Sequence, residues 1–292
     1  MVLRNRRTSS SSNRGGAPFS RRGLLAGAGG LALGGLLTGV ASAGAAQPED
    51  PWTYIRRMET TPDYGQAVGQ PARDFDRFKA DGRRWDAFLQ TPVKEGQDFH
   101  YTCEFDSSWI VLKAHGLEME LDEQLDIVGI DETLEPYYEE TSDGFLIWGG
   151  DIAEHFSGNY DSNFLARAKG SAVRKVFDEV GLVVTPVDDR KGIEKALLAG
   201  EHVWFKSTVD FLLWRPATWI TPAGEEHSVV LSNDHALVVM GFNDEHVVIR
   251  DPLGPTTTNT ERPYQYRVRW ERFLDVFAAQ GNDGLAVGPE RD

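Results

Sequence analysis

Residues 235–252 read HALVVMGFNDEHVVIRDP, and this stretch predicts a pair of strands. The first run, residues 236–241, is uninterrupted apolar sequence, which is typical of a buried strand. A short polar loop follows, and residues 246–250 form a second apolar run. Because so few residues separate the two runs, the strands are expected to be antiparallel neighbours. The stretch therefore predicts a buried hairpin.

Two side chains at the open end of this hairpin could act together. If the loop is centred on Asn243, His235 lies directly opposite Asp251 on the same face, because opposed residue numbers in a hairpin sum to a constant. A two-residue turn at Asn243-Asp244 would instead shift the pairing by one residue and point Asp251 to the other face. We expect the first arrangement, in which the carboxylate orients the imidazole.

Cys103 is the one cysteine of the 292-residue chain, so it cannot form an internal disulfide. It lies in QDFHYTCEFDSSWIVLKAHG, residues 97–116, where apolar residues recur at helical spacing and Gly116 is a suitable stop. Cys103 is therefore predicted to begin a helix. The partial positive charge of the backbone amides there favours a thiolate over a thiol. The alternative is a buried, inert thiol.

Four residues follow one another in the order in which a papain-like thiol hydrolase uses them. Gln97 would donate to an oxyanion, Cys103 would be the nucleophile, His235 its base and Asp251 the group that orients the base. The alternative for Gln97 is an ordinary exposed loop residue. Most of the other histidines have ordinary structural explanations, because they lie among apolar neighbours or in expected loops.

Residues 1–46 have the organisation of an export signal. The first 22 residues hold six arginines and no acid, residues 23–43 are uncharged, and Ala-Ser-Ala at 41–43 suits cleavage. Arg21-Arg22 and an apolar region diluted by seven glycines are typical of a twin-arginine signal. A membrane anchor is the alternative. We expect passage through the twin-arginine export machinery, cleavage, an extracellular or cell-envelope location, and no stable membrane association afterwards.

The charge balance excludes one class of partner. The formal net charge is −15, and loss of the six signal arginines leaves 24 basic against 45 acidic residues, or −21. Since the sequence also lacks a basic patch interleaved with aromatic residues, no nucleic-acid binding is expected.

We divide the rest of the chain into an N-terminal arm or linker, residues 47–95, and a catalytic domain, residues 96–290. The arm is polar and without repeats, and we favour a packing arm over a prodomain. In the domain, helices are expected over 172–180, 192–199 and 269–279, and strands over 182–186, 202–206, 264–268 and 284–287. This pattern predicts an α+β fold with a helical part, an antiparallel sheet and an active-site cleft between them.

The sequence contains one pair of possible metal ligands. Asp151 and His155 stand four residues apart and could share a helix face. Two ligands without a third do not make a zinc site. We therefore expect neither a metal nor another cofactor.

Several short elements together carry a resemblance to a known family. They are Gln97 with Thr102-Cys103-Glu104 and Gly116; Gly150-Asp151 with Phe156-Ser157-Gly158-Asn159; the loop Trp219-Ile220-Thr221-Pro222-Ala223-Gly224; His235 with Gly241-Phe242; and Asp251-Pro252. In this order, over about residues 96–288, they resemble the papain-like cysteine peptidases of the bacteriocin-processing (peptidase C-39-type) family, in particular its stand-alone exported branch.

The resemblance implies a papain-like fold and hydrolysis of a peptide or protein substrate through a Cys103-His235-Asp251 triad with Gln97 as oxyanion donor. Glu104 replaces the glycine of the family's leader peptidases, and the sequence contains no transporter domain, so processing of double-glycine leaders is not expected. An amidase or acyltransferase acting on cell-wall peptides would need the same residues. A catalytically silent papain-fold binding or scaffold protein at the cell surface is the alternative outside enzymes.

Overall fold

The computed structural model describes residues 85–213, 215–255, 260 and 262–290, all within a unit that spans Pro48–Asp292. The predicted signal, residues 1–46, and most of the predicted arm lie outside the described residues. In the described part of the chain, no helix has the length and apolar character needed to cross a bilayer.

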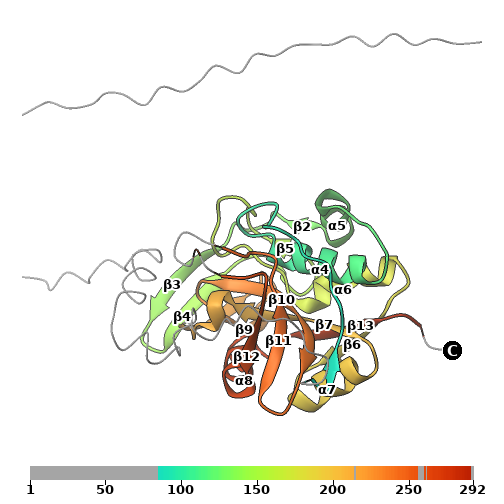
Figure 1. The fold of residues 1–292 in the computed structure, drawn as a ribbon. Coiled ribbons are helices and arrows are strands. Elements are labelled where there is room, and N and C mark those ends of the chain that lie inside the picture. The colour runs from blue at the N-terminus through green and yellow to red at the C-terminus, as the bar shows by residue number, and fades with distance from the viewer. Residues whose placement is uncertain (1–84, 214, 256–259, 261, 291–292) are drawn as a thin grey trace, which may run out of the picture. The chain divides into compact units, whose positions relative to one another are not determined.

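A seven-stranded antiparallel sheet forms the centre of this unit (Figure 1). Its path is β12-β11-β10-β7-β13-β6, and β1 pairs with the end of β10 that β7 leaves free. The strands are β1 (Ala87–Phe88), β6 (Val183–Val187), β7 (His202–Thr208), β10 (Asp234–Phe242), β11 (His246–Arg250), β12 (Gln265–Arg269) and β13 (Gly284–Gly288). The residues of β1 fall on the arm side of the predicted boundary at residue 95, yet they belong to this sheet.

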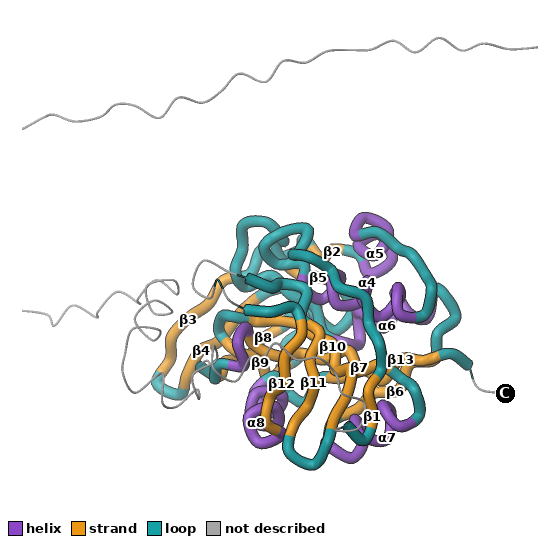
Figure 2. Tube along the Cα trace, viewed as in Figure 1, coloured by secondary structure: helices purple, strands orange, loops and turns teal. Residues whose placement is uncertain are grey.

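Helices cover both faces of the sheet (Figure 2). They are α4 (Cys103–Ala114), α5 (Leu121–Val128), α6 (Gly170–Glu179), α7 (Arg190–Leu198), α8 (Trp270–Ala279) and the short 3₁₀ helix η1 (Val209–Phe211). Ala236 and Val238 of β10 belong to the core with α4 and α6, whereas Leu237 and Val239 belong to the core with α7 and α8. This alternation explains the uninterrupted apolar run, because both faces of β10 are buried.

A second sheet was not predicted from the sequence. It has the order β3-β4-β8-β9, with strands β3 (Tyr137–Thr141), β4 (Gly144–Trp148), β8 (Pro216–Ile220) and β9 (Glu226–Val230). The pair β4 and β8 is parallel, as is the short pair β2 (Ile130–Asp131) and β5 (Phe156–Ser157). The expected loop at 219–224 is therefore partly strand, because its first two residues close β8.

The predicted helix at Cys103 and the predicted hairpin are both confirmed. The predicted register of the hairpin is wrong. Asn243 begins the loop instead of centring it, because its side-chain oxygen accepts from the backbone N–H groups of Glu245 and His246 at 3.0 and 2.8 Å. Residues 243–245 form the loop between β10 and β11, and Phe242 pairs with Val247.

A β-bulge then restores the geometry that His235 and Asp251 need. Gly241 pairs with Val248 but Val239 pairs with Ile249, so Met240 is an extra residue in β10. Continued without the bulge, the pairing at the loop would bring Asp251 opposite Val238, on the other face from His235. With the bulge, Asp251 follows β11 at the level of Leu237, and it therefore shares a face with His235.

Candidate active site

Cys103 is the first residue of α4, and the turn before it is held by side-chain hydrogen bonds. Thr102 Oγ1 donates to Asp106 Oδ2 at 2.7 Å and accepts from the backbone N–H of Phe99 at 3.1 Å. The cysteine itself is only 5% exposed. The sequence predicts a nucleophile in an open cleft, but in this state the sulfur is covered.

The sulfur is a thiol in this arrangement. Cys103 Sγ donates to Glu104 Oε2 at 3.2 Å. Burial and the neighbouring Glu104 carboxylate raise the pKa of the thiol well above its ordinary value, against an opposing effect of Lys206. The predicted resting thiolate is therefore wrong for this state, because burial and a carboxylate at the sulfur outweigh the helix N-terminus.

His235 and Asp251 meet as the sequence predicts, although not through the predicted register. His235 Nε2 lies 2.9 Å from Asp251 Oδ1, and both side chains are buried. Burial alone would raise the pKa of Asp251, but the charges of His235 and Arg262 lower it to about 2. The carboxylate is therefore ionised and suited to accept from Nε2–H, so Nδ1 is the ring nitrogen that does not bond to Asp251.

Sequence reasoning missed the residues that hold Asp251. Tyr266 donates from its hydroxyl to Asp251 Oδ2 at 2.8 Å, and Arg262 lies 3.5 Å from the same oxygen while also pairing with Asp210. The backbone N–H of Leu253 donates to Oδ1 at 2.8 Å. Tyr266 sits opposite Ile249, two residues before Asp251, so the strand predicted at 264–268 contained the signal.

Gln97 is partly buried, and its side-chain nitrogen Nε2 is buried without a hydrogen-bond partner among the described residues. Its chain neighbours are anchored on both sides. Gly96 N–H donates to the carbonyl of Pro252 at 3.1 Å, and Asp98 N–H donates to Asp106 Oδ1 at 3.4 Å. Since an unpaired buried amide is costly, this donor is available to a ligand.

The structure brings the nucleophile's helix and the base's strand together at their first residues. Ser107 of α4 donates to the carbonyl of Ala236, the residue after His235, at 2.7 Å. Sγ of Cys103 and a carboxylate oxygen of Asp234, the residue before His235, lie within 4.8 Å. Among the described residues, Sγ makes no hydrogen bond to the His235 ring, since it is turned toward Glu104.

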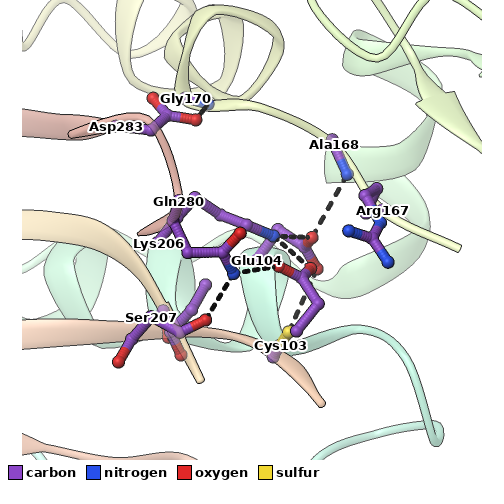
Figure 3. Close-up of polar contacts among 12 residues, drawn as sticks. Cys103, Glu104, Arg167, Ala168, Gly170, Lys206, Ser207, Gln280 and Asp283 are labelled. Atoms are coloured by element: carbon purple, nitrogen blue, oxygen red, sulfur yellow. Dashed lines mark hydrogen bonds and ion pairs between the residues drawn. The ribbon is translucent and has the colours of Figure 1, made fainter. Parts of the chain in front are cut away.

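A buried charge network lies directly behind the nucleophile (Figure 3). Lys206 Nζ lies 2.6 Å from Glu104 Oε1 and 2.5 Å from Asp234 Oδ2. Cys103, Glu104 and Asp234 are close enough to share a metal ion, but the ammonium of Lys206 already bonds to both carboxylates. The chemistry of this set is therefore that of an ion-pair network.

In the described part of the chain, Asp151 and His155, the possible metal pair of the sequence, make no hydrogen bond or ion pair with each other through their side chains. Asp151 Oδ1 accepts from the backbone N–H of Ala153 at 3.0 Å. Its carboxylate instead approaches Glu225 and His227 within 4.8 Å, in a group that is partly exposed.

No protein-family model matches the chain, and no curated protein matches its sequence. A search of solved structures finds a crystal structure from Bacillus anthracis that is provisionally described as a C39-like peptidase. The two chains are 18% identical with a TM-score of 0.55, and the match covers 70% of this chain and 98% of the other. This similarity concerns the fold, and it agrees with the resemblance noted in the sequence. The described part of the chain is thus a mixed fold of helices and antiparallel sheet that it shares with a C39-like peptidase structure.

Proposed function

We propose that this chain is a papain-like cysteine peptidase of the C39-like type, with Cys103 as nucleophile, His235 as base, Asp251 as orienting group and Gln97 as oxyanion donor. One observation carries the proposal. His235 forms a buried pair with Asp251 at 2.9 Å, and it lies on β10, the strand against which the helix of the chain's one cysteine packs. Ala236, the residue after His235, is also hydrogen-bonded to that helix through Ser107, and a purely structural histidine would not need an ionised carboxylate as its partner.

Catalysis begins with rotation of the Cys103 side chain away from Glu104 toward His235. Nδ1 accepts the thiol proton, and the resulting thiolate attacks the substrate carbonyl carbon. The oxyanion accepts from Gln97 Nε2 and from the backbone N–H of Cys103, each contact contributing about 3 kcal/mol to transition-state stabilisation.

The tetrahedral intermediate then collapses to a thioester, and the leaving amine takes the proton from the imidazolium. His235 next deprotonates a water that attacks the thioester carbon. The carboxylic acid leaves, and the proton returns to the sulfur. Throughout, Asp251 holds the ring in the required tautomer through its bond to Nε2 and stabilises the imidazolium.

Two measurements on the exported protein test the proposal: chemical labelling of its thiol and cleavage of a peptide library. Iodoacetamide labels Cys103, the chain's one thiol, and His235→Ala is expected to slow labelling near neutral pH by at least about tenfold. His246→Ala, at the other end of the same hairpin, is the matched control. A peptide-library digest with Cys103→Ala as the inactive control identifies the bond that is cleaved.

The alternatives give different results. Labelling that ignores His235→Ala, together with no cleavage, would indicate the silent scaffold at the cell surface. Labelling that depends on His235, with release or transfer of acyl groups from cell-wall amides and no peptide-bond cleavage, would indicate the amidase or acyltransferase.

We also propose that the protein is exported through the twin-arginine machinery and released from the membrane by cleavage near Ala43. Arg21 and Arg22 with the diluted apolar segment support this route. Replacing both arginines by lysine is expected to block export. Mass spectrometry of the exported protein should find an N-terminus after the signal, and an intact Met1 would contradict the proposal.

A further inference from the structure

Lys206 lies at a special position relative to the candidate triad. It projects from β7 and bonds to Glu104 at 2.6 Å and to Asp234 at 2.5 Å. Glu104 is the chain neighbour of Cys103, and Asp234 is the chain neighbour of His235. One ammonium therefore links the residue next to the nucleophile with the residue next to the base.

The network around Lys206 is closed on itself. Glu104 Oε1 also accepts from the backbone N–H of Ala168 at 3.2 Å, and Glu104 Oε2 accepts from the thiol of Cys103. Asp234 Oδ1 accepts from Gln280 Nε2 at 2.6 Å. Each carboxylate oxygen thus has a protein partner, and each carboxylate bonds to groups from at least two segments of the chain. Figure 3 shows Glu104 with Lys206 and Ala168.

The electrostatics require a cation at this point. Burial would lower the pKa of Lys206, but Asp234 and Glu104 raise it above its ordinary value, so the ammonium stays charged. Its charge in turn lowers the pKa of Asp234, against burial. Without the lysine, two carboxylates would lie close together in a site that excludes water, an arrangement that costs several kcal/mol in proteins.

The same charge acts on the sulfur. Glu104 and Asp234 both oppose ionisation of Cys103, and Lys206 favours it. The sulfur must become a thiolate to react. By lowering the pKa of the thiol, Lys206 favours the reactive form.

We propose that Lys206 is a positioning residue for the reaction: it fixes the start of α4 against the start of β10, and it supplies the positive charge that lets Cys103 ionise beside Glu104 and Asp234. This inference rests on the proposed function for its catalytic meaning. It is distinct from the triad, because Lys206 acts through the two neighbours and touches no substrate atom.

Iodoacetamide labelling of the exported protein tests the proposal without a substrate. Lys206→Met keeps the length of the side chain and removes its charge. The labelling rate between pH 6 and 10 is expected to shift to higher pH by at least about one unit, so that the rate at pH 8 falls about tenfold. Lys191→Met, an exposed change on α7, should leave the profile unchanged.

A charge-balanced pair of variants covers the case in which Lys206→Met does not fold. Asp234→Asn and the double variant Asp234→Asn with Lys206→Met differ only in the lysine, and the double variant removes one charge of each sign. The double variant should label about tenfold more slowly at pH 8 than Asp234→Asn alone. Equal profiles within the pair, with a lower melting temperature for the double variant, would reduce Lys206 to a structural residue and overturn the inference.

The outcomes separate this inference from the proposed function. If His235→Ala changes the labelling profile and Lys206→Met does not, the triad stands and the role of Lys206 fails. If Lys206→Met shifts the profile and His235→Ala does not, the hydrolase proposal fails, and Lys206 remains only the counter-charge of a buried thiol. On a cleaved peptide, loss of kcat with little change in KM in Lys206→Met completes the support.

Discussion

His235 Nε2 lies 2.9 Å from Asp251 Oδ1, although the two residues do not face each other across their hairpin. Asp251 lies at the level of Leu237, two residues along β10 from His235. The extra residue Met240 puts Asp251 on the same face of the sheet as His235. The candidate base is thus oriented across a diagonal of the sheet. Tyr266 and Arg262 hold the carboxylate from the far side.

Asp251→Asn tests the orientation of the base. The amide keeps the size of the side chain but presents either a donor or a weaker acceptor to Nε2. The imidazole is then no longer held in the tautomer that the reaction needs, and its protonated form is no longer stabilised by a negative charge. We expect kcat/KM to fall by about three to four orders of magnitude, as for the comparable change in a serine protease triad. Activity within tenfold of the parent would contradict the assigned role. Asp244→Asn, in the exposed loop of the same hairpin, serves as the control.

Tyr266→Phe tests the support behind Asp251. The hydroxyl donates to Oδ2 at 2.8 Å inside the core, and a hydrogen bond to a charged group contributes about 1.5–3 kcal/mol. The folded-state pKa of Asp251, about 2, lies below its ordinary value of 3.8, so its stabilisation is present above pH 4 and is lost as pH falls through 2.

Loss of the hydroxyl should bring the pKa of Asp251 closer to its ordinary value. The free energy of unfolding at pH 7 should fall by about 1.5–3 kcal/mol, and acid unfolding should begin at a higher pH. Urea unfolding at several pH values measures both. Tyr264 is the control, because its hydrogen bond with Asp251 is made by the backbone carbonyl, which accepts from the Asp251 N–H at 3.0 Å. Tyr264→Phe therefore removes a hydroxyl and leaves that bond intact, and an equal effect there would show that the Tyr266 contact is not specific.

Local patterns allowed the main sheet and the nucleophile's helix to be predicted. The spacing of Phe105, Trp109 and Leu112 and the stop at Gly116 lie within one segment, so they place Cys103 at a helix start without knowledge of the rest of the chain. The apolar runs of β10 and β11 identify buried strands for the same reason.

The second sheet could not be predicted in this way. Strand β3 reads YYEET and is mostly exposed, so it lacks the alternation that marks a half-buried strand. Its neighbour β4 pairs in parallel with β8, about 70 residues later in the chain, and nothing local encodes that pairing. The bulge at Met240 is likewise seen only in the pairing of β10 with β11.

The charge network was hidden because its members are far apart in sequence. Lys206 did carry a signal, since it is a charged residue within the buried strand HVWFKST, and a buried lysine needs a carboxylate. The sequence did not say which of 45 acidic residues supplies it. For Gln97 the position was predicted, but its buried unpaired nitrogen is a property of the fold.

Gln97→Ala tests the oxyanion donor. Nε2 has no partner in the free protein among the described residues, so its loss removes no internal hydrogen bond, and stability should be unchanged. If the amide binds the oxyanion, kcat should fall about 10²–10³-fold with little change in KM. Unchanged kcat would make Gln97 an ordinary loop residue. Gln90→Ala, at an exposed position in the same N-terminal stretch, is the matched control for the peptide assay.

Asp106 gives the nucleophile's helix a pH-dependent stability. Burial raises the pKa of this carboxyl to about 7, although hydrogen bonds from Thr102 and Lys94 oppose the shift. Because the folded-state pKa lies above the ordinary value of 3.8, the stabilisation is complete below about pH 4 and is lost as pH rises through 7. The protein therefore has to ionise a buried carboxyl in the first turn of α4 when it works above neutral pH.

Asp106→Asn should remove this dependence, since an amide keeps an acceptor for Thr102 and carries no charge. Relative to the parent, the variant should gain unfolding free energy between pH 4 and pH 8, by up to about 4 kcal/mol for a shift of this size. Urea unfolding at four pH values measures the difference, with Asp98→Asn as control because its exposed carboxylate contacts the same lysine. A difference between parent and variant that stays constant with pH would mean that Asp106 is already ionised at pH 4, and that Lys94 and Thr102 compensate its burial in full.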